Sequence, residues 1–180
     1  MSDAAQPVHN AKILPYVHLD GVPTLRDSDL LGLYDRMDRE GLAGSCYQEG
    51  RLHWLEEMKS RRSLLYVCMG DDGPMGMVWL NAFRGRYAHS HLVIFRAYHG
   101  RANILTARWA IQTVLRSRDA HGEYLWDGFV GMTPETNRLA VAFALRCGFR
   151  KVGVVPFGAY DFRQNKSVPA VLTVLEREEA

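Results

Sequence analysis

GMTPETNRLAVAFALRCGF, residues 131–149, carries the clearest structural signal in the sequence, because it marks both ends of one helix. Thr133 is a residue type that caps helix N-termini, and Pro134 suits the first helical position. Gly148 suits the left-handed conformation that often follows the last helical turn. The stretch therefore predicts a helix over residues 133–146, set between two strands.

Upstream of this helix the hydrophobic pattern changes period. Three short apolar runs, at 64–69, 75–83 and 87–96, are separated by polar, glycine-containing turns, which predicts an antiparallel meander. Apolar residues then recur at helical spacing over 103–118. The full expected order is a strand at 13–19, helices at 25–40 and 51–61, the three meander strands, the helix at 103–118, a strand at 124–131, the helix at 133–146, and strands at 151–156 and 168–176.

This order of elements predicts the fold class. A meander followed by β-α-β-α-β indicates a mixed, mostly antiparallel sheet of about six to seven strands flanked by about four helices, an α/β (α+β) architecture. The chain has 180 residues, with neither an internal repeat nor a linker-like segment. We therefore expect a single domain over residues 1–180, with residues 1–11 as a flexible tail.

The composition argues against several classes of protein. The chain has 22 Lys and Arg against 20 Asp and Glu, a formal net charge of +2, which is too small for a dedicated nucleic-acid binder. No apolar run reaches the roughly 18–20 residues of a membrane helix, and the N-terminus lacks a secretory-signal pattern. The three cysteines are scattered and form neither a disulfide framework nor a metal-ligand spacing. We expect a cytoplasmic protein without metal, membrane or nucleic-acid partners.

Residues 95–104, FRAYHGRANI, join the last meander strand to the following helix. Small residues in such a turn, here Gly100 and Ala102, let backbone N–H groups at a helix N-terminus face an anion. Arg96 and Arg101 add positive charge at the same place. A phosphate site is therefore one interpretation of this turn, and an ordinary connecting loop is the other.

The stretch 131–149 resembles the GCN5-related N-acetyltransferase (GNAT) family. That family has an Asn near the start of its penultimate helix, an Ala three residues later, a further aromatic residue or Leu, and Gly-Phe at the start of the next strand. The strand, turn and helix at 87–118 fall where the family holds the pyrophosphate of acetyl-CoA. The resemblance covers about residues 64–160 well, and the earlier residues only by element order. The matching residues are Asn137, Ala140, Phe143, Gly148 and Phe149.

Two positions depart from the family pattern. The family's pyrophosphate loop reads Gln/Arg-x-x-Gly-x-Gly/Ala, and aligning Gly100 and Ala102 with its two small residues leaves the leading Gln or Arg unmatched. The family's usual general acid, a Tyr seven residues after the motif Asn, is replaced by Ala144. The combination is similar to a divergent subgroup found in phages and prophages. It also favours an alternative, a catalytically inactive GNAT-fold binding or structural protein.

The resemblance implies an N-acetyltransferase that moves an acetyl group from acetyl-CoA to a primary amine, by direct attack in a ternary complex. It implies that CoA lies between strands 87–96 and 124–131, and that a backbone N–H of the first strand polarises the thioester carbonyl. The implied partners are a small-molecule or peptide amine and a second copy of the chain in a homodimer. The implied cofactor-binding residues are Ile94, Phe95, Arg96, Gly100, Arg101, Ala102, Asn103, Asn137 and Phe143.

Such a reaction needs a base that takes a proton from the amine. His89 and His91 lie two residues apart on one strand, so their side chains should share a face. With an unperturbed pKa near 6.5, a neutral imidazole would suit this role near pH 7, while solvated histidines at a strand edge are the alternative. Tyr160, expected in a glycine-containing loop at 157–159, and Tyr98 are candidates for the missing acid. Simple packing of these aromatic rings is the other interpretation.

Overall fold

A computed structural model describes residues 10–43, 49–99, 101–161 and 164–177. Residues 1–9 of the expected tail lie outside this part of the chain. Within the described residues, no helix is long and apolar enough to cross a membrane. The elements are β1 Lys12–Pro15, β2 His18–Leu19, β3 Val22–Pro23, α1 Asp27–Arg39, α3 Arg51–Lys59, β4 Leu64–Gly70, β5 Gly73–Arg84, β6 Tyr87–Ile94, a 3-10 turn Arg96–Tyr98, α4 Arg101–Leu115, β7 Gly128–Pro134, α5 Arg138–Arg146, β8 Arg150–Asp161 and β9 Lys166–Glu176.

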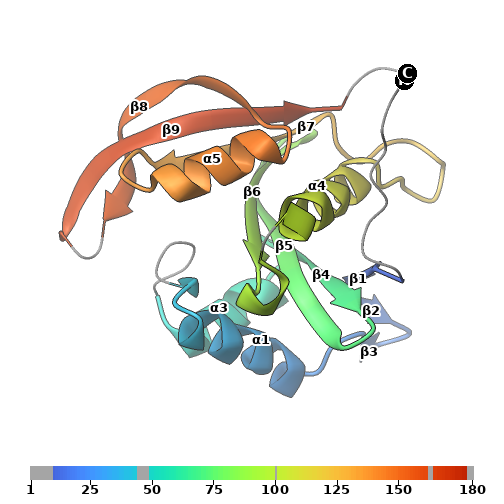
Figure 1. Ribbon diagram of the computed structural model, residues 1–180. Helices are drawn as coiled ribbons and strands as arrows, with labels where there is room; N and C mark the ends of the chain where they lie inside the picture. The colour runs from blue at the N-terminus through green and yellow to red at the C-terminus, as the bar shows by residue number, and fades with distance from the viewer. Residues whose placement is uncertain (1–9, 44–48, 100, 162–163, 178–180) are drawn as a thin grey trace.

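The described strands form a seven-stranded sheet in the order β1-β4-β5-β6-β7-β9-β8, beside a small β2-β3 hairpin (Figure 1). Every neighbouring pair in the large sheet is antiparallel except β6 and β7, which are parallel. The helices α1, α3, α4 and α5 flank this sheet. The sequence-based prediction of a mixed, mostly antiparallel α+β fold is confirmed.

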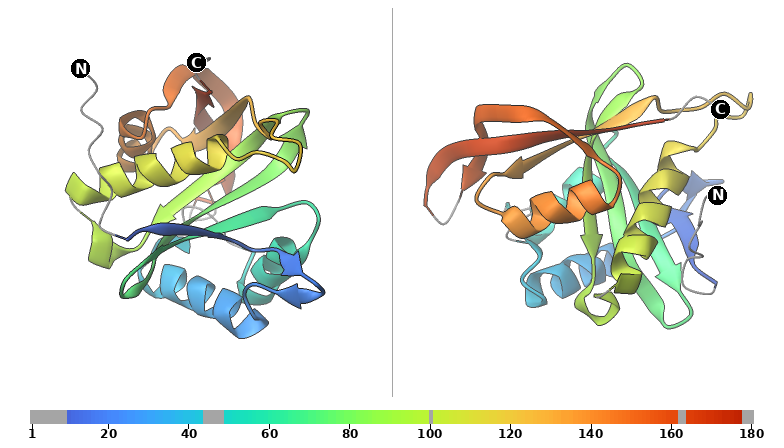
Figure 2. Two further views of the ribbon diagram at one scale, coloured as in Figure 1. Left: turned by 90° about the vertical axis from the view of Figure 1, so that its right-hand side faces the viewer. Right: turned by 45° about the horizontal axis from the view of Figure 1, so that its top comes forward.

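The sheet separates two hydrophobic clusters, because alternate residues of its central strands point to opposite faces. On one face, Val78 and Leu80 of β5 pack with Ile111 of α4. On the other, Met77 and Trp79 pack beneath α1 and α3. Figure 2 shows α4 on one side of the sheet and α1 on the other. Each of these side chains is fully buried and contributes about 1.5–3 kcal/mol, so β5 and its neighbour β6 are held firmly from both sides.

The single strand predicted at 13–19 is two strands, β1 and β2, with residues 16 and 17 between them. β1 ends at Pro15, and the chain then turns into the β2-β3 hairpin around Asp20 and Gly21, both at positive φ. The Thr24 hydroxyl donates to the Pro15 carbonyl at 2.7 Å and accepts the Val17 N–H at 3.1 Å. This local hydrogen bonding replaces the sheet pairing that would continue the strand.

The helix predicted at 133–146 begins five residues too early. Thr133 and Pro134 belong to β7, where they pair with β9, and α5 begins at Arg138. Asn137 caps the helix, and its Oδ1 accepts the Ala140 N–H at 3.2 Å. Both Thr and Asn are good capping residues, so the local signal was ambiguous. Gly148, at φ 105°, does follow the helix as predicted.

Candidate functional site

The strands β6 and β7 lie side by side only over their first residues. Three pairs join them, Tyr87 to Gly128, Ala88 to Phe129 and His89 to Val130. Beyond these pairs β6 stays with β5 and β7 stays with β9, so the two strands separate (Figure 1). The separation opens a cleft of about 110 Å³, lined by residues that include His91 and Leu92 of β6, Met132 and Thr133 of β7, and Asn137, Phe143 and Ala144 at and within α5.

The backbone of β6 presents hydrogen-bonding groups to this cleft. In an antiparallel strand the N–H and C=O groups of successive residues point to opposite sides. The Phe95 N–H donates to the Met75 carbonyl at 2.9 Å, on the β5 side. By this alternation the groups of Leu92 and Ile94 point to the β7 side. The Ile94 carbonyl meets the Nε2 of His99 at 2.9 Å, and the groups of Leu92 face the cleft.

His89 and His91 share one face of β6, as predicted, and their ring centroids are 4.7 Å apart. The Nε2 of His89 accepts the Met132 N–H at 3.2 Å, so its proton lies on Nδ1. The Nε2 of His91 lies 3.3 Å from the Asn81 Oδ1, an acceptor, so that nitrogen carries the proton. Within the described part of the chain, the lone pair without a hydrogen-bond partner is therefore on the Nδ1 of His91, and the N–H without a partner is on the Nδ1 of His89.

Both imidazoles are weaker bases than an exposed histidine. Burial lowers the pKa of His89. Burial, and to a lesser extent the neighbouring His89, lower the pKa of His91 to about 3. Trp79 covers one face of the His91 ring, with the planes 5° apart and the centroids at 4.7 Å. The expectation of an unperturbed pKa near 6.5 is therefore wrong, and His91 is neutral at pH 7.

The lowered pKa of His91 makes the free energy of unfolding depend on pH. An unfolded histidine binds a proton below about pH 6.5, whereas folded His91 does so only near its pKa of about 3. The unfolded state then binds more protons, so stability should fall as pH decreases through this window, by up to about 1.4 kcal/mol per pH unit. Thermal melts from about pH 5 to 7.5 should show a steeper loss for the wild type than for His91→Gln. Parallel curves would contradict the burial of a neutral ring.

The turn after β6 contains most of the residues expected to bind the cofactor. Gly100 lies outside the described residues, as do the side chains of Arg101, Ala102 and Asn103, so their contact with pyrophosphate stays a prediction. Phe95 is fully buried, and its N–H is bonded to β5. Arg96 donates from Nε to the carbonyl of Glu40 at 2.7 Å, which directs its side chain to the end of α1.

The remaining candidates divide between the cleft and other parts of the fold. Asn137 and Phe143 line the cleft. Tyr160 lies near the far end of β8, where its hydroxyl donates to the Asn165 Oδ1 at 2.6 Å, and the structure does not bring it to the histidines. The loop predicted at 157–159 is part of β8.

Sequence reasoning missed the residues that hold His91. Trp79 and Asn81 lie on β5, and the register places Trp79 directly opposite His91. Their two-residue spacing on a predicted strand was a usable signal, because it puts both on one face. The register that brings this face to the histidines is not readable from the spacing alone.

Comparison with known proteins shows the fold. No family model and no curated protein matches the sequence. Among solved structures, the Salmonella typhimurium acetyltransferase that modifies the N-terminal serine of 50S ribosomal subunit protein L7/L12 matches with a TM-score of 0.70 and 14% identity, over 95% of this chain and 97% of that one. Spermidine N-acetyltransferase from Vibrio cholerae, in complex with CoA and spermine, matches with a TM-score of 0.65 and 14% identity, over 92% and 95%. The chain has the GNAT fold.

The match spans 95% of this chain, so the GNAT fold includes most of the first 60 residues, which the sequence motifs did not cover. In this fold the central break in the sheet is the β6-β7 separation, and the histidine pair lies beside that break. The resemblance to a phage and prophage subgroup is tested by none of these matches and stays a prediction.

Proposed function

We propose that this GNAT-fold chain is an N-acetyltransferase that moves the acetyl group of acetyl-CoA to a primary amine. The observation that supports it best is the break between β6 and β7, with β6 backbone groups and His91 facing the cleft. A strand edge that lacks its neighbour can pair with an extended chain that has amide groups, and the pantetheine arm of CoA is such a chain.

The described residues fit this cosubstrate. Leu92 lines the cleft, and its backbone groups point to the β7 side of β6, where the pantetheine amides would pair. Helix α4 begins at Arg101 and runs for 15 residues, and the partial positive charge of its N-terminus favours a pyrophosphate there. Asn137 and Phe143 lie on the opposite wall of the cleft.

The proposed reaction forms a C–N bond and breaks the C–S bond of the thioester. The Leu92 N–H donates a hydrogen bond to the carbonyl oxygen as negative charge develops on it. The Nδ1 of His91 takes the proton that the amine loses, and passes it to the departing CoA thiolate. The products are free CoA and an N-acetyl amine, and no tyrosine is needed at position 144.

Calorimetry with CoA, followed by a thiol-release screen of amines and peptides, tests the proposal. We expect binding in the micromolar range, on the order of −8 kcal/mol. Arg101→Glu should weaken it, since it adds a negative charge at the start of α4. Arg116→Glu, the same charge change just after the other end of α4, is the matched control. No heat at millimolar CoA would contradict the proposal, and binding without any thiol release would support the alternative, an inactive GNAT-fold binding protein.

A further inference from the structure

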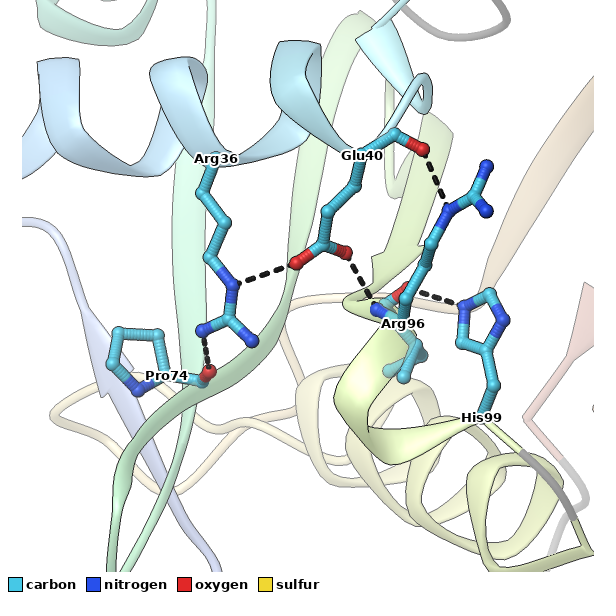
Figure 3. Close-up of polar contacts among 6 residues, drawn as sticks. Arg36, Glu40, Pro74, Arg96 and His99 are labelled. Atoms are coloured by element: carbon cyan, nitrogen blue, oxygen red, sulfur yellow. Dashed lines mark hydrogen bonds and ion pairs between the residues drawn. The ribbon is translucent and has the colours of Figure 1, made fainter.

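The turn that follows β6 is held by a carboxylate from a distant helix. Glu40, at the C-terminus of α1, is separated from Arg96 by 56 positions in the sequence. Its Oε2 accepts the Arg96 backbone N–H at 2.5 Å, and its main-chain carbonyl accepts the Nε of the same arginine at 2.7 Å (Figure 3). One residue of α1 therefore binds both the backbone and the side chain of the first turn residue.

Arg36 fixes this carboxylate from its other side. The Nε of Arg36 donates to the Glu40 Oε1 at 2.9 Å, and its Nη1 donates to the Pro74 carbonyl at 2.8 Å. The same guanidinium lies 4.1 Å from the centre of the Phe95 ring. Burial by itself raises the pKa of Glu40, but the bonds from Arg96 and Arg36 outweigh it and lower that pKa, so the carboxylate is ionised at pH 7. Only 17% of the Glu40 side chain is exposed.

These contacts fix the turn at both of its ends. The Arg96 N–H begins a 3-10 turn, so it has no acceptor within that turn, and Glu40 supplies one. At the other end, the Nε2 of His99 meets the Ile94 carbonyl at 2.9 Å (Figure 3). The guanidinium of Arg96 is meanwhile engaged at the carbonyl end of α1, where the helix dipole favours a positive charge. Residues 95–99 thus have one set position just before α4.

We propose that Glu40 is a positioning residue for CoA, which holds the turn 95–99 so that the first N–H groups of α4 face the pyrophosphate. The inference rests on the proposed function. Arg96 then holds the turn and does not bind the phosphate. Helix α1, which lies on the side of the sheet that carries the histidines, thereby contributes to the binding of the cosubstrate. Because Glu40 acts through its bonds to Arg96, we expect its effect on the affinity for CoA.

Glu40→Gln tests this assignment by calorimetry with CoA. A glutamine has one acceptor oxygen and one NH₂ group, so one of the two N–H donors that face it loses its partner. We expect the Kd for CoA to rise about tenfold, the effect of losing one charged hydrogen bond at the turn. Asp38→Asn is the matched control, since it removes the same charge from an exposed position on the last turn of α1.

A second pair of variants isolates the backbone bond without touching Glu40. Arg96→Ala removes the guanidinium and keeps the N–H, whereas Arg96→Pro removes both. Phe95 has φ −69° and ψ 147°, which suits a residue before proline, and position 96 is the first of its turn, where proline is accepted. We expect the proline variant to bind CoA several-fold more weakly than the alanine variant, and both to remain folded.

The outcomes separate this inference from the proposed function. Equal Kd values for Glu40→Gln and Asp38→Asn, even with a lower melting temperature for the first, would overturn the positioning role and show that Glu40 is purely structural. Equal Kd values for the proline and alanine variants at position 96 would overturn it as well. A wild type that does not bind CoA would overturn the proposed function and this inference together.

Discussion

Replacing His91 by Gln should lower turnover by roughly 10²–10⁴-fold, the range expected for loss of a general base. The reason is geometric: the Nε2 of His91 faces Asn81, and only its Nδ1 is left to accept a proton from the amine. The Kd for CoA should stay nearly unchanged, because the pairing proposed for the pantetheine arm uses backbone groups of β6, which the substitution keeps. Thiol release and calorimetry on the same preparation measure the two quantities.

His89→Gln is the comparison for this experiment. A glutamine oxygen can accept the Met132 N–H in place of the His89 Nε2, so this variant should lose less activity than His91→Gln. The pH profile gives a further check. Because the pKa of His91 is about 3, the pH dependence of the wild-type rate should reflect the titration of the acceptor amine and show no step near pH 6.5. Wild-type turnover in both variants would place the base elsewhere.

Leu92→Pro should lower turnover by roughly 10²–10³-fold, as expected when one oxyanion donor is removed. Proline has no N–H, and at this position the N–H points to the cleft rather than to β5. The ladder between β5 and β6 therefore keeps its hydrogen bonds, and the fold should survive. Thiol release under saturating acetyl-CoA measures the effect on turnover.

Leu92→Ala is the control, since it shortens the side chain and keeps the N–H. It should retain most of the turnover that the proline variant loses. If the two variants are equally slow, the side chain of Leu92 matters and its N–H does not, which would contradict the proposed polarisation of the thioester. Circular dichroism of both proteins shows whether the sheet is intact.

The sequence predicted the order of the elements well because hydrophobic period and glycine turns are local signals. The error at α5 shows that such local signals do not report which strands pair. Thr133 and Pro134 look like a helix start, but β9 provides a strand partner for both of them, and no local rule contains that partner. The helix then starts at the next capping residue, Asn137. The hairpin after Pro15 was missed for a similar reason, since a threonine side chain replaces the sheet bonds there.

The candidate site was predicted in part. The shared face of His89 and His91 follows from strand alternation alone. Their lowered pKa values do not, because they depend on burial against Trp79, a residue on another strand. The contact between Glu40 and Arg96 could not be predicted from any local pattern, because it joins residues 56 positions apart. Local pattern predicts which residues face the same way, and only the folded chain decides what covers them.

The three-pair junction between β6 and β7 is also the shortest pairing in the large sheet. On either side of it the strands pair over longer stretches, since β5 and β6 share seven pairs, as do β7 and β9. Joining residues about 40 positions apart costs more chain entropy than closing the hairpin of β5 and β6, and only three pairs offset that cost. The cleft therefore begins where the described sheet has the fewest pairs, so a substitution that loosens this junction would change the cleft before it changes either half of the sheet.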